Sequence, residues 1–152
     1  MLYRFLYPIA RLYWLIFKPV TFGVRIILIN DGKILLVRHT YLPDWMLPGG
    51  TVEYQEDFST AIQRELREEL NICLKNVRLF GLYKSQIEGK LDHIIFFRSE
   101  DPVDQSLIKI DPKEIIEYRF FSLTNLPENI SPGHLRRIVE HQNHQDPICG
   151  PW

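Results

Sequence analysis

The segment over 57–70 constrains the fold most, because its residues are good helix formers and include neither glycine nor proline. Asn71 follows the segment and tolerates the left-handed backbone conformation at which many helices end. At about 100° per residue, three carboxylates of this helix, Glu65, Glu68 and Glu69, fall in one sector. The sequence therefore predicts a helix that carries an acidic cluster.

This acidic cluster costs free energy unless its charges are neutralised, because carboxylates at positions i, i+3 and i+4 repel one another. Phe58, Ala61 and Ile62 lie in much the same sector one turn earlier, which places the cluster beside apolar packing. Hard divalent cations with oxygen ligands are the natural neutralisers. We therefore expect a site for Mg²⁺ or Mn²⁺. The alternative is a solvated helix stabilised by pairs such as Arg64 with Glu68.

Composition and charge exclude several classes of protein. The chain has 152 residues, which predicts one domain with one hydrophobic core. Apolar residues make up 45% and charged residues 24%, which excludes a disordered, collagenous or coiled-coil chain. The formal net charge of -1 gives no basic field for a nucleic-acid polymer, so we expect no such partner. Cys73 and Cys149 lie far apart in a chain without a secretory signature, which favours reduced thiols and a cytoplasmic location.

The rest of the chain alternates between strand and helix signals. Residues 22–29 and 33–38 are rich in Val, Ile and Leu and flank the turn-forming Asn30-Asp31-Gly32, which predicts a hairpin. Pro48-Gly49-Gly50 leads into a short extended piece over 51–54. Further strands are expected over 77–87, 91–98 and 118–123, and a last helix is expected over about 132–144, with Ser131 as its cap. This order predicts an α+β fold, a layered α/β/α sandwich with a mixed β-sheet.

The first eighteen residues are the most apolar stretch of the chain, and their three cations, Arg4, Arg11 and Lys18, recur every seven residues. Pro8 would kink a helix there, and the stretch is too short for a straight membrane span. We expect an aromatic-rich helical arm that packs on its own domain, joins two copies in a homodimer, or contacts a membrane surface. The predicted organisation is an arm over 1–18, a domain over 19–146 and a C-terminal tail over 147–152.

The predicted helix and the loop before it contain a longer pattern. Gly50 is followed by five residues and Glu56, then by seven residues and Arg64-Glu65-Leu66-x-Glu68-Glu69-x-Asn71-Ile72. This pattern resembles the signature of the Nudix hydrolases: Gly, five residues, Glu, seven residues, then Arg-Glu-apolar-x-Glu-Glu-x-Gly-apolar. Asn71 stands where the family has glycine, and asparagine can adopt the positive φ of a turn. Residues 50–72 are called the box below.

The resemblance implies an enzyme that uses a divalent metal to hydrolyse a phosphoanhydride bond in a nucleoside diphosphate linked to another moiety. It implies that the metal ligands are Glu65, Glu68 and Glu69, that Glu56 supports the metal or a water, and that the Gly49 carbonyl can complete the shell. Arg64 is expected to organise the carboxylates through bidentate contacts.

The family draws its general base either from the box glutamates, among which Glu68 is counted as catalytic here, or from a later loop glutamate. By resemblance that later residue is Glu114, which precedes an aromatic strand over 118–123, and Glu117 is the reserve choice. The alternative for Glu114 is a solvated loop acid.

Arg25 and Arg38 interrupt apolar strands, so they are expected to contact substrate phosphate or, alternatively, to be exposed at a strand edge. Two other classes of function stay open. One is a Nudix-fold module that binds a nucleotide or a protein without useful turnover, and the other is a membrane-peripheral interaction protein organised by the arm. The intact box carboxylates favour the hydrolase, because an inactive site has no reason to hold repelling glutamates together. We expect a nucleotide-type small molecule as substrate, and no motif outside the box identifies it further.

Overall fold

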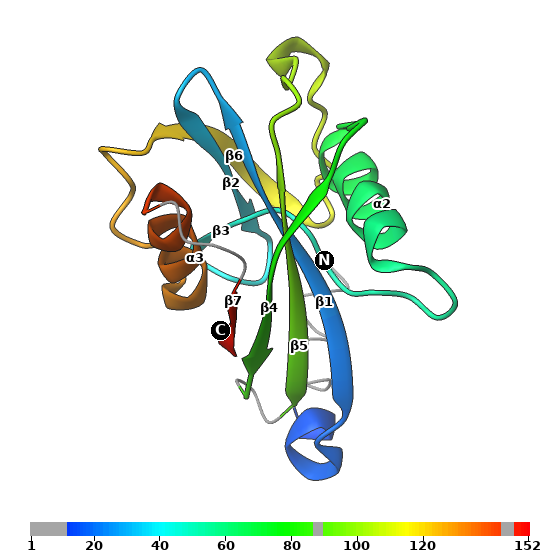
Figure 1. Cartoon of the computed structure of the whole chain (residues 1–152). Coiled ribbons are helices and arrows are strands. Elements are labelled where there is room, and N and C mark those ends of the chain that lie inside the picture. The colour runs from blue at the N-terminus through cyan, green and yellow to red at the C-terminus, as the bar shows by residue number, and fades with distance from the viewer. Residues whose placement is uncertain (1–11, 87–89, 144–147) are drawn as a thin grey trace.

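The predicted hairpin is present and begins the sheet (Figure 1). The computed structural model describes residues 12–86, 90–143 and 148–152. β1 (Val20–Asn30) and β2 (Lys33–His39) run antiparallel, and Asp31 and Gly32 between them have φ values of 49° and 71°. Two consecutive positive φ values are those of a type I′ turn, whose twist matches that of the paired strands.

β1 and β2 belong to a seven-stranded sheet with the order β3-β2-β1-β5-β4-β7, in which β6 pairs with β2. The other strands are β3 (Trp45–Met46), β4 (Arg78–Ser85), β5 (Leu91–Ser99), β6 (Ile115–Ser122) and β7 (Ile148–Pro151). The β1–β5 and β4–β7 pairs are parallel, whereas β2 pairs antiparallel with β1, β3 and β6, and β4 pairs antiparallel with β5. The sheet is therefore mixed, as predicted.

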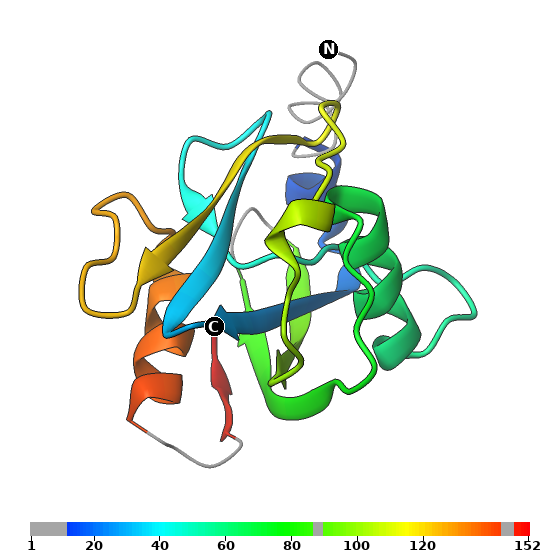
Figure 2. The same ribbon diagram turned by 90° about the horizontal axis from the view of Figure 1, so that it is seen from above.

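One helix covers each face of this sheet (Figures 1 and 2). α2 (Phe58–Leu70) buries Ala61, Ile62, Leu66 and Leu70 against one face, and Ile138 of α3 (Pro132–Gln142) is buried against the other. Because side chains alternate along a strand, β2 directs Leu35 and Val37 toward α2, whereas Ile34 and Leu36 join the core under α3. The predicted α/β/α sandwich is confirmed.

Both ends of α2 have regular caps. At the start, Asp57 accepts a hydrogen bond from the Thr60 N–H at 2.8 Å. At the end, Asn71 adopts φ 56° and donates its N–H to the Arg67 carbonyl at 3.0 Å. The left-handed turn that the sequence predicts at Asn71 is therefore present, although the residue is not glycine.

β1 and β2 pair only near their turn. The part of β1 that does not pair with β2 forms hydrogen bonds with the loop before α2. The β1 residues paired with β2 are Ile29 and Asn30. Nearer its start, β1 bonds to that loop instead: the Val24 N–H donates to the Gly50 carbonyl at 2.9 Å, and the Ile26 N–H donates to the Pro48 carbonyl at 3.1 Å. The loop is therefore held along β1.

The predicted C-terminal tail over 147–152 contains strand β7 within its described residues. β7 pairs in parallel with β4, and Trp152 is buried with its ring centre 5.8 Å from that of Tyr83 and 5.9 Å from that of Phe96. Arg137 of α3 donates to the Pro151 carbonyl at 3.0 Å. Burial of the indole explains why these residues pack on the domain.

Three details differ from the sequence-based predictions. Trp45 and Met46 form the short strand β3, which is not among the predicted strands, because they pair with the end of β2. β6 starts at Ile115 instead of residue 118, since its first residues pair with the last residues of β2. Ser131 stands at the N-cap of α3, but its side chain makes no capping hydrogen bond, and Pro132 fixes the first turn.

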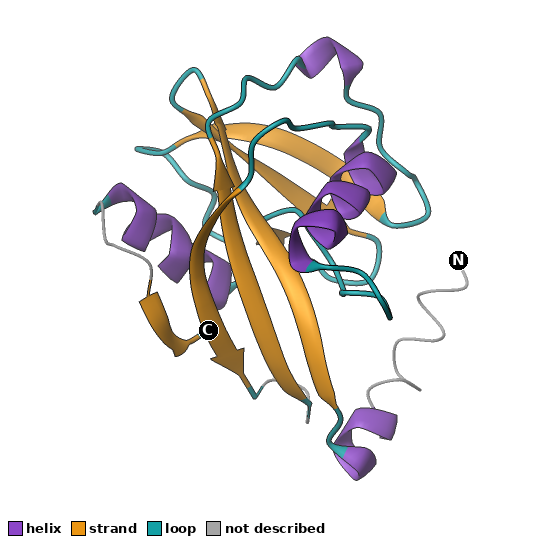
Figure 3. Cartoon of the chain, turned by 45° about the vertical axis from the view of Figure 1, so that its right-hand side comes forward, coloured by secondary structure: helices purple, strands orange, loops and turns teal. Residues whose placement is uncertain are grey.

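Part of the predicted arm is described. Residues 12–17 form a helix that leads into β1, and residues 1–11 lie outside the described ranges. The Lys18 N–H donates to the Trp14 carbonyl at 2.9 Å, and Lys18 has φ 44°, which turns the chain toward β1. Figure 3 shows this helix beyond the start of β1, away from α2 and α3. Within the ranges that the structure describes, no helix has the length and hydropathy needed to cross a bilayer.

Candidate active site

The acidic sector of α2 carries two buried carboxylates and one exposed carboxylate. Glu65 and Glu69 are 8% and 2% exposed, whereas the side chain of Glu68 is 61% exposed. Burial removes water from a carboxylate and disfavours its charged form. It raises the pKa of Glu69 to about 8 and also raises the pKa of Glu65. The two acids therefore lie beside the apolar layer under α2, as the neighbouring apolar positions of the helix predict.

The glycine loop before α2 forms the wall next to these two carboxylates. The Gly49 N–H donates to Glu69 Oε2 at 3.3 Å. Gly49 has φ 124°, and a Cβ atom at Gly50 would lie 2.4 Å from the carboxylate of Glu65. A side chain at either position would strain the backbone or displace a glutamate. The two glycines therefore allow the loop to approach the buried acids.

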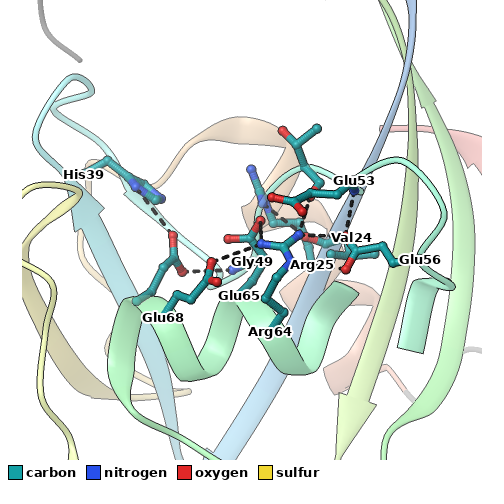
Figure 4. A network of polar contacts seen from close by, with 11 residues as sticks. Val24, Arg25, His39, Gly49, Glu53, Glu56, Arg64, Glu65 and Glu68 are labelled. Atoms are coloured by element: carbon teal, nitrogen blue, oxygen red, sulfur yellow. Dashed lines mark hydrogen bonds and ion pairs between the residues drawn. The ribbon is translucent and has the colours of Figure 1, made fainter. Parts of the chain in front are cut away.

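Arg64 connects three carboxylates of the box (Figure 4). Its guanidinium lies 2.7 Å from Glu56 Oε1, 3.0 Å from Glu65 Oε1 and 3.1 Å from Glu68 Oε2. It also donates to the Thr51 carbonyl at 2.9 Å. The hydrogen bonds to Arg64 lower the pKa of Glu56, and the same bonds raise the pKa of Arg64. These contacts are the ones expected of a residue that organises the carboxylates.

His39 is a residue of this site to which the sequence analysis assigns no role. It ends β2 on the face of Leu35 and Val37, and its Nδ1 atom lies 3.8 Å from Glu69 Oε1. The side chain is buried, and neither ring nitrogen makes a hydrogen bond to the residues that the structure describes. Burial, followed by the charge of Arg25, lowers its pKa to about 3. The signal that could have found it is the alternation along β2, which places residue 39 on the α2 face.

Glu114, the predicted loop base, lies close to the box. The Asp111 N–H donates to the Glu69 backbone carbonyl at 3.1 Å, and the Thr40 N–H donates to the Glu114 backbone carbonyl at 2.8 Å. The loop is therefore tied both to the end of α2 and to the residue after β2. After burial, the charge of Glu114 is among the effects that raise the pKa of Glu65 and of Glu69.

Arg25 also lies within electrostatic reach of the box. Its positive charge lowers the pKa of Glu65 and of Glu69, against the larger effect of burial on each acid. Figure 4 shows it beside Gly49. The structure therefore brings this predicted phosphate contact close to the carboxylates.

Arg38 and Glu117 lie on the opposite face of the sheet. The Arg38 guanidinium is 2.7 Å from Glu117 Oε2 and 5.5 Å from the centre of the Trp45 ring, which packs in the core under α3. Alternation along β2 accounts for this placement, because residue 38 points away from the face that carries His39. The structure does not bring the second predicted phosphate contact or the reserve base to the box carboxylates.

The donor atoms of the box suit a hard divalent cation. Carboxylates and backbone carbonyls are the oxygen ligands that Mg²⁺ and Mn²⁺ prefer, and the box with its loop supplies both. Over the described ranges, no three acidic, histidine or cysteine side chains are already gathered as a metal site. Arg64 instead spans Glu56, Glu65 and Glu68 and neutralises part of their charge. The chemistry of the donors fits a cation, and Arg64 holds three of them within reach of one another.

Comparison with known proteins agrees with this arrangement. The NUDIX domain family matches residues 19–141. Over 114 residues the chain is 32% identical to the NAD-capped RNA hydrolase NudC of Shigella dysenteriae serotype 1 (strain Sd197), covering 73% of this chain and 43% of that protein. Over 104 residues it is 35% identical to an ADP-ribose pyrophosphatase of Methanocaldococcus jannaschii, covering 65% of this chain and 60% of the relative. The chain thus spans between about two fifths and three fifths of the curated relatives it matches.

Solved structures show the same fold. The MutT protein from Methanosarcina mazei Go1 superposes with a TM-score of 0.72 at 27% identity, over 84% of this chain and 95% of that one. The MutT NUDIX hydrolase from Burkholderia pseudomallei gives a TM-score of 0.71 at 23% identity, over 79% and 96% of the two chains. The family match, the fold and the box with its glycine loop together show that this chain belongs to the Nudix family.

Proposed function

We propose that the chain is a divalent-metal-dependent pyrophosphohydrolase that cleaves a nucleoside diphosphate linked to another moiety. The observation that carries the proposal is the burial of Glu65 and Glu69 next to each other beside the glycine loop. Two buried acids raise the free energy of the fold unless protons or cations neutralise them. A phosphorylated substrate is itself anionic, so a cation is also needed for it to approach these acids.

In this proposal Glu65, Glu68 and Glu69 hold the cation, and Glu56 and the Gly49 carbonyl complete its ligands. The bound cation supplies neutralisation of phosphate charge and a Lewis acid. Arg64 keeps the carboxylates oriented through its three ion pairs. His39 packs against Glu69 and limits the positions that this acid can take.

The proposed reaction transfers a phosphoryl group to water. The oxygen of water forms a bond to phosphorus, the bridging P–O bond breaks, and the bridging oxygen leaves with the electron pair. Glu114 accepts the proton of the attacking water, a role supported by its anchored loop beside the box. Arg25 contacts the phosphate, in keeping with its reach to both buried acids. Arg38 has no comparable support, because it pairs with Glu117 on the other face.

The substrate proposal rests on chemistry that two relatives share. One is named an ADP-ribose pyrophosphatase and the other an NAD-capped RNA hydrolase. NAD and ADP-ribose, which these names mention, both contain an adenosine diphosphate unit. We therefore propose a nucleotide-type substrate with such a unit. Cys73 and Cys149 are free and exposed, which supports a reducing compartment such as the cytoplasm.

The experiment is a panel of nucleotides and nucleotide conjugates assayed for mononucleotide and phosphate release, with Mg²⁺ and separately with Mn²⁺. Glu65→Gln is the test variant, and Glu128→Gln is the matched control, because Glu128 is exposed and lies outside the box. The proposal predicts release that needs the metal and falls at least about a hundredfold in Glu65→Gln only. Binding of a nucleotide without turnover under all conditions would favour the alternative, a Nudix-fold binding module.

A further inference from the structure

The helix over residues 12–17, which precedes β1, exposes most of its apolar side chains. Over residues 12–17, five of six are large apolar side chains with 52% to 65% of their surface exposed: Leu12, Tyr13, Leu15, Ile16 and Phe17. Val20, the first residue of β1, is 58% exposed as well. We call these six residues the arm surface. Single exposed apolar residues are ordinary in soluble proteins, but a contiguous group marks an interaction surface.

The arm surface is a ridge and not a groove. At about 100° per residue, its five helical members spread over more than half of the helix circumference. Trp14 points to the remaining side, where the Lys90 ammonium lies 4.4 Å from the centre of its ring. The helix is therefore attached to the domain on one side and open on the others, and Figure 3 shows it at the start of β1. A convex apolar surface of this kind suits insertion into the apolar layer of a lipid bilayer.

The sequence of the arm carries positive charge and no acid. Residues 1–24 contain Arg4, Arg11 and Lys18 and neither aspartate nor glutamate, and of these cations Lys18 lies in the described part of the chain, where it is exposed. Lys90 adds a further cation next to Trp14. The nearest acid along the paired strand, Asp92, accepts a hydrogen bond from Thr21 at 2.7 Å and lies 3.8 Å from Lys90. Lys90 is therefore paired with Asp92, whereas Lys18 is an exposed cation next to the ridge, and such a cation attracts anionic lipid headgroups.

We propose that the arm surface binds the chain to anionic lipid bilayers, with the helix over 12–17 lying in the interface. Its aliphatic side chains enter the boundary between headgroups and acyl chains, and Tyr13 places an amphipathic ring at the level of the headgroups. Lys18 contacts the lipid phosphates. A contact between two copies through the same ridge is the alternative, and the sedimentation experiment below distinguishes it from lipid binding.

The test is flotation of the full chain with vesicles of phosphatidylcholine alone and of phosphatidylcholine mixed with phosphatidylserine. Wild type is expected to float with the mixed vesicles at least about fivefold more than with the neutral ones. The variant Ile16→Ser/Phe17→Ser should lose flotation on both, and Lys18→Glu should reduce flotation at least about fivefold on the mixed vesicles alone. Leu79→Ser and Leu107→Ser are matched controls, since these leucines are 57% and 59% exposed elsewhere on the domain, and they should bind like wild type.

Two results would overturn the proposal. One is the absence of flotation with anionic vesicles. The other is a concentration-dependent dimer in analytical sedimentation that Ile16→Ser/Phe17→Ser abolishes, because the ridge would then be a contact between copies. Thermal unfolding of each variant separates loss of binding from loss of fold. The proposal does not depend on hydrolysis, so its failure leaves the proposed function untouched.

Discussion

Gly50 and the carboxylate of Glu65 are so close that a Cβ atom on the glycine would lie 2.4 Å from all three atoms of the carboxylate. The glutamate side chain can move, whereas the loop is fixed to β1 by the hydrogen bond from Val24 to the Gly50 carbonyl. An added methyl group would therefore displace the glutamate. The position of a box acid thus depends on the size of a residue fifteen positions earlier in the chain.

We predict that Gly50→Ala lowers kcat at least about tenfold, in the range typical of changes that misplace a metal ligand. The midpoint of thermal unfolding should change little, because only a flexible side chain has to move. The control is Gly23→Ala, whose added Cβ would lie 3.4 Å from the Gly50 carbonyl, an ordinary contact. Equal kcat values for the two variants would show that the position of Glu65 does not matter.

The stability of the metal-free chain should depend on the raised pKa of Glu69, which is about 8 as a result of burial. An acid with a raised pKa in the folded state binds more protons there than in the unfolded state. The free energy of unfolding therefore falls as pH rises from about 5 to about 8, by roughly 2–4 kcal/mol, and then levels off. Glu69→Gln should flatten this decline.

The measurement is chemical denaturation in the presence of a chelator at several pH values across that range. Glu128→Gln serves as the control and should keep the decline. A wild-type chain whose free energy of unfolding rises with pH in this range would contradict the assignment of a buried, protonated Glu69.

Glu114 and Glu117 should differ sharply in their effect on turnover. Glu114→Gln is predicted to lower kcat by about 10²–10⁴-fold with little change in KM, since it removes a proton acceptor and leaves substrate binding intact. Glu117→Gln should leave kcat near that of wild type, because Glu117 pairs with Arg38 on the other face. Steady-state kinetics of the two variants test this difference. A larger loss of kcat in Glu117→Gln than in Glu114→Gln would instead assign the base to Glu117, on the α3 side of the sheet.

Trp152 should contribute strongly to stability and little to catalysis. Its ring is buried against Tyr83 and Phe96 in the core under α3, on the other face of the sheet from α2, so Trp152→Ala is expected to cost about 3–5 kcal/mol of unfolding free energy. KM and kcat of the folded fraction should stay close to wild type. Denaturation and kinetics on the same preparation test this, and a stable variant with altered kcat would give the tryptophan a different role.

The features predicted well from the sequence are those that local spacing determines. The three box glutamates share a sector because positions i, i+3 and i+4 do so in any α-helix. The hairpin follows from Asn30-Asp31-Gly32, and the end of α2 follows from Asn71. Each of these depends on a few neighbouring residues, so the structure reproduces them closely.

The features that the sequence could not supply depend on partners distant in the chain. The two-residue strand β3 forms because it pairs with β2, and β7 forms because it pairs with β4. Arg25 and Arg38 look alike as cations in apolar strands, yet only Arg25 lies near the box acids. Which face of β2 meets α2 is a property of the tertiary packing, and for the same reason the sequence alone gives no role to His39.

The most direct test of the account is calorimetric titration of the chain with Mn²⁺, and then with Mg²⁺, in the absence of nucleotide. We predict saturable binding that weakens at least about tenfold in Glu65→Gln and in Glu69→Gln and is unchanged in Glu128→Gln. Binding that is equal in all four proteins, or no binding with or without a nucleotide diphosphate, would contradict the claim that these buried acids hold a divalent cation.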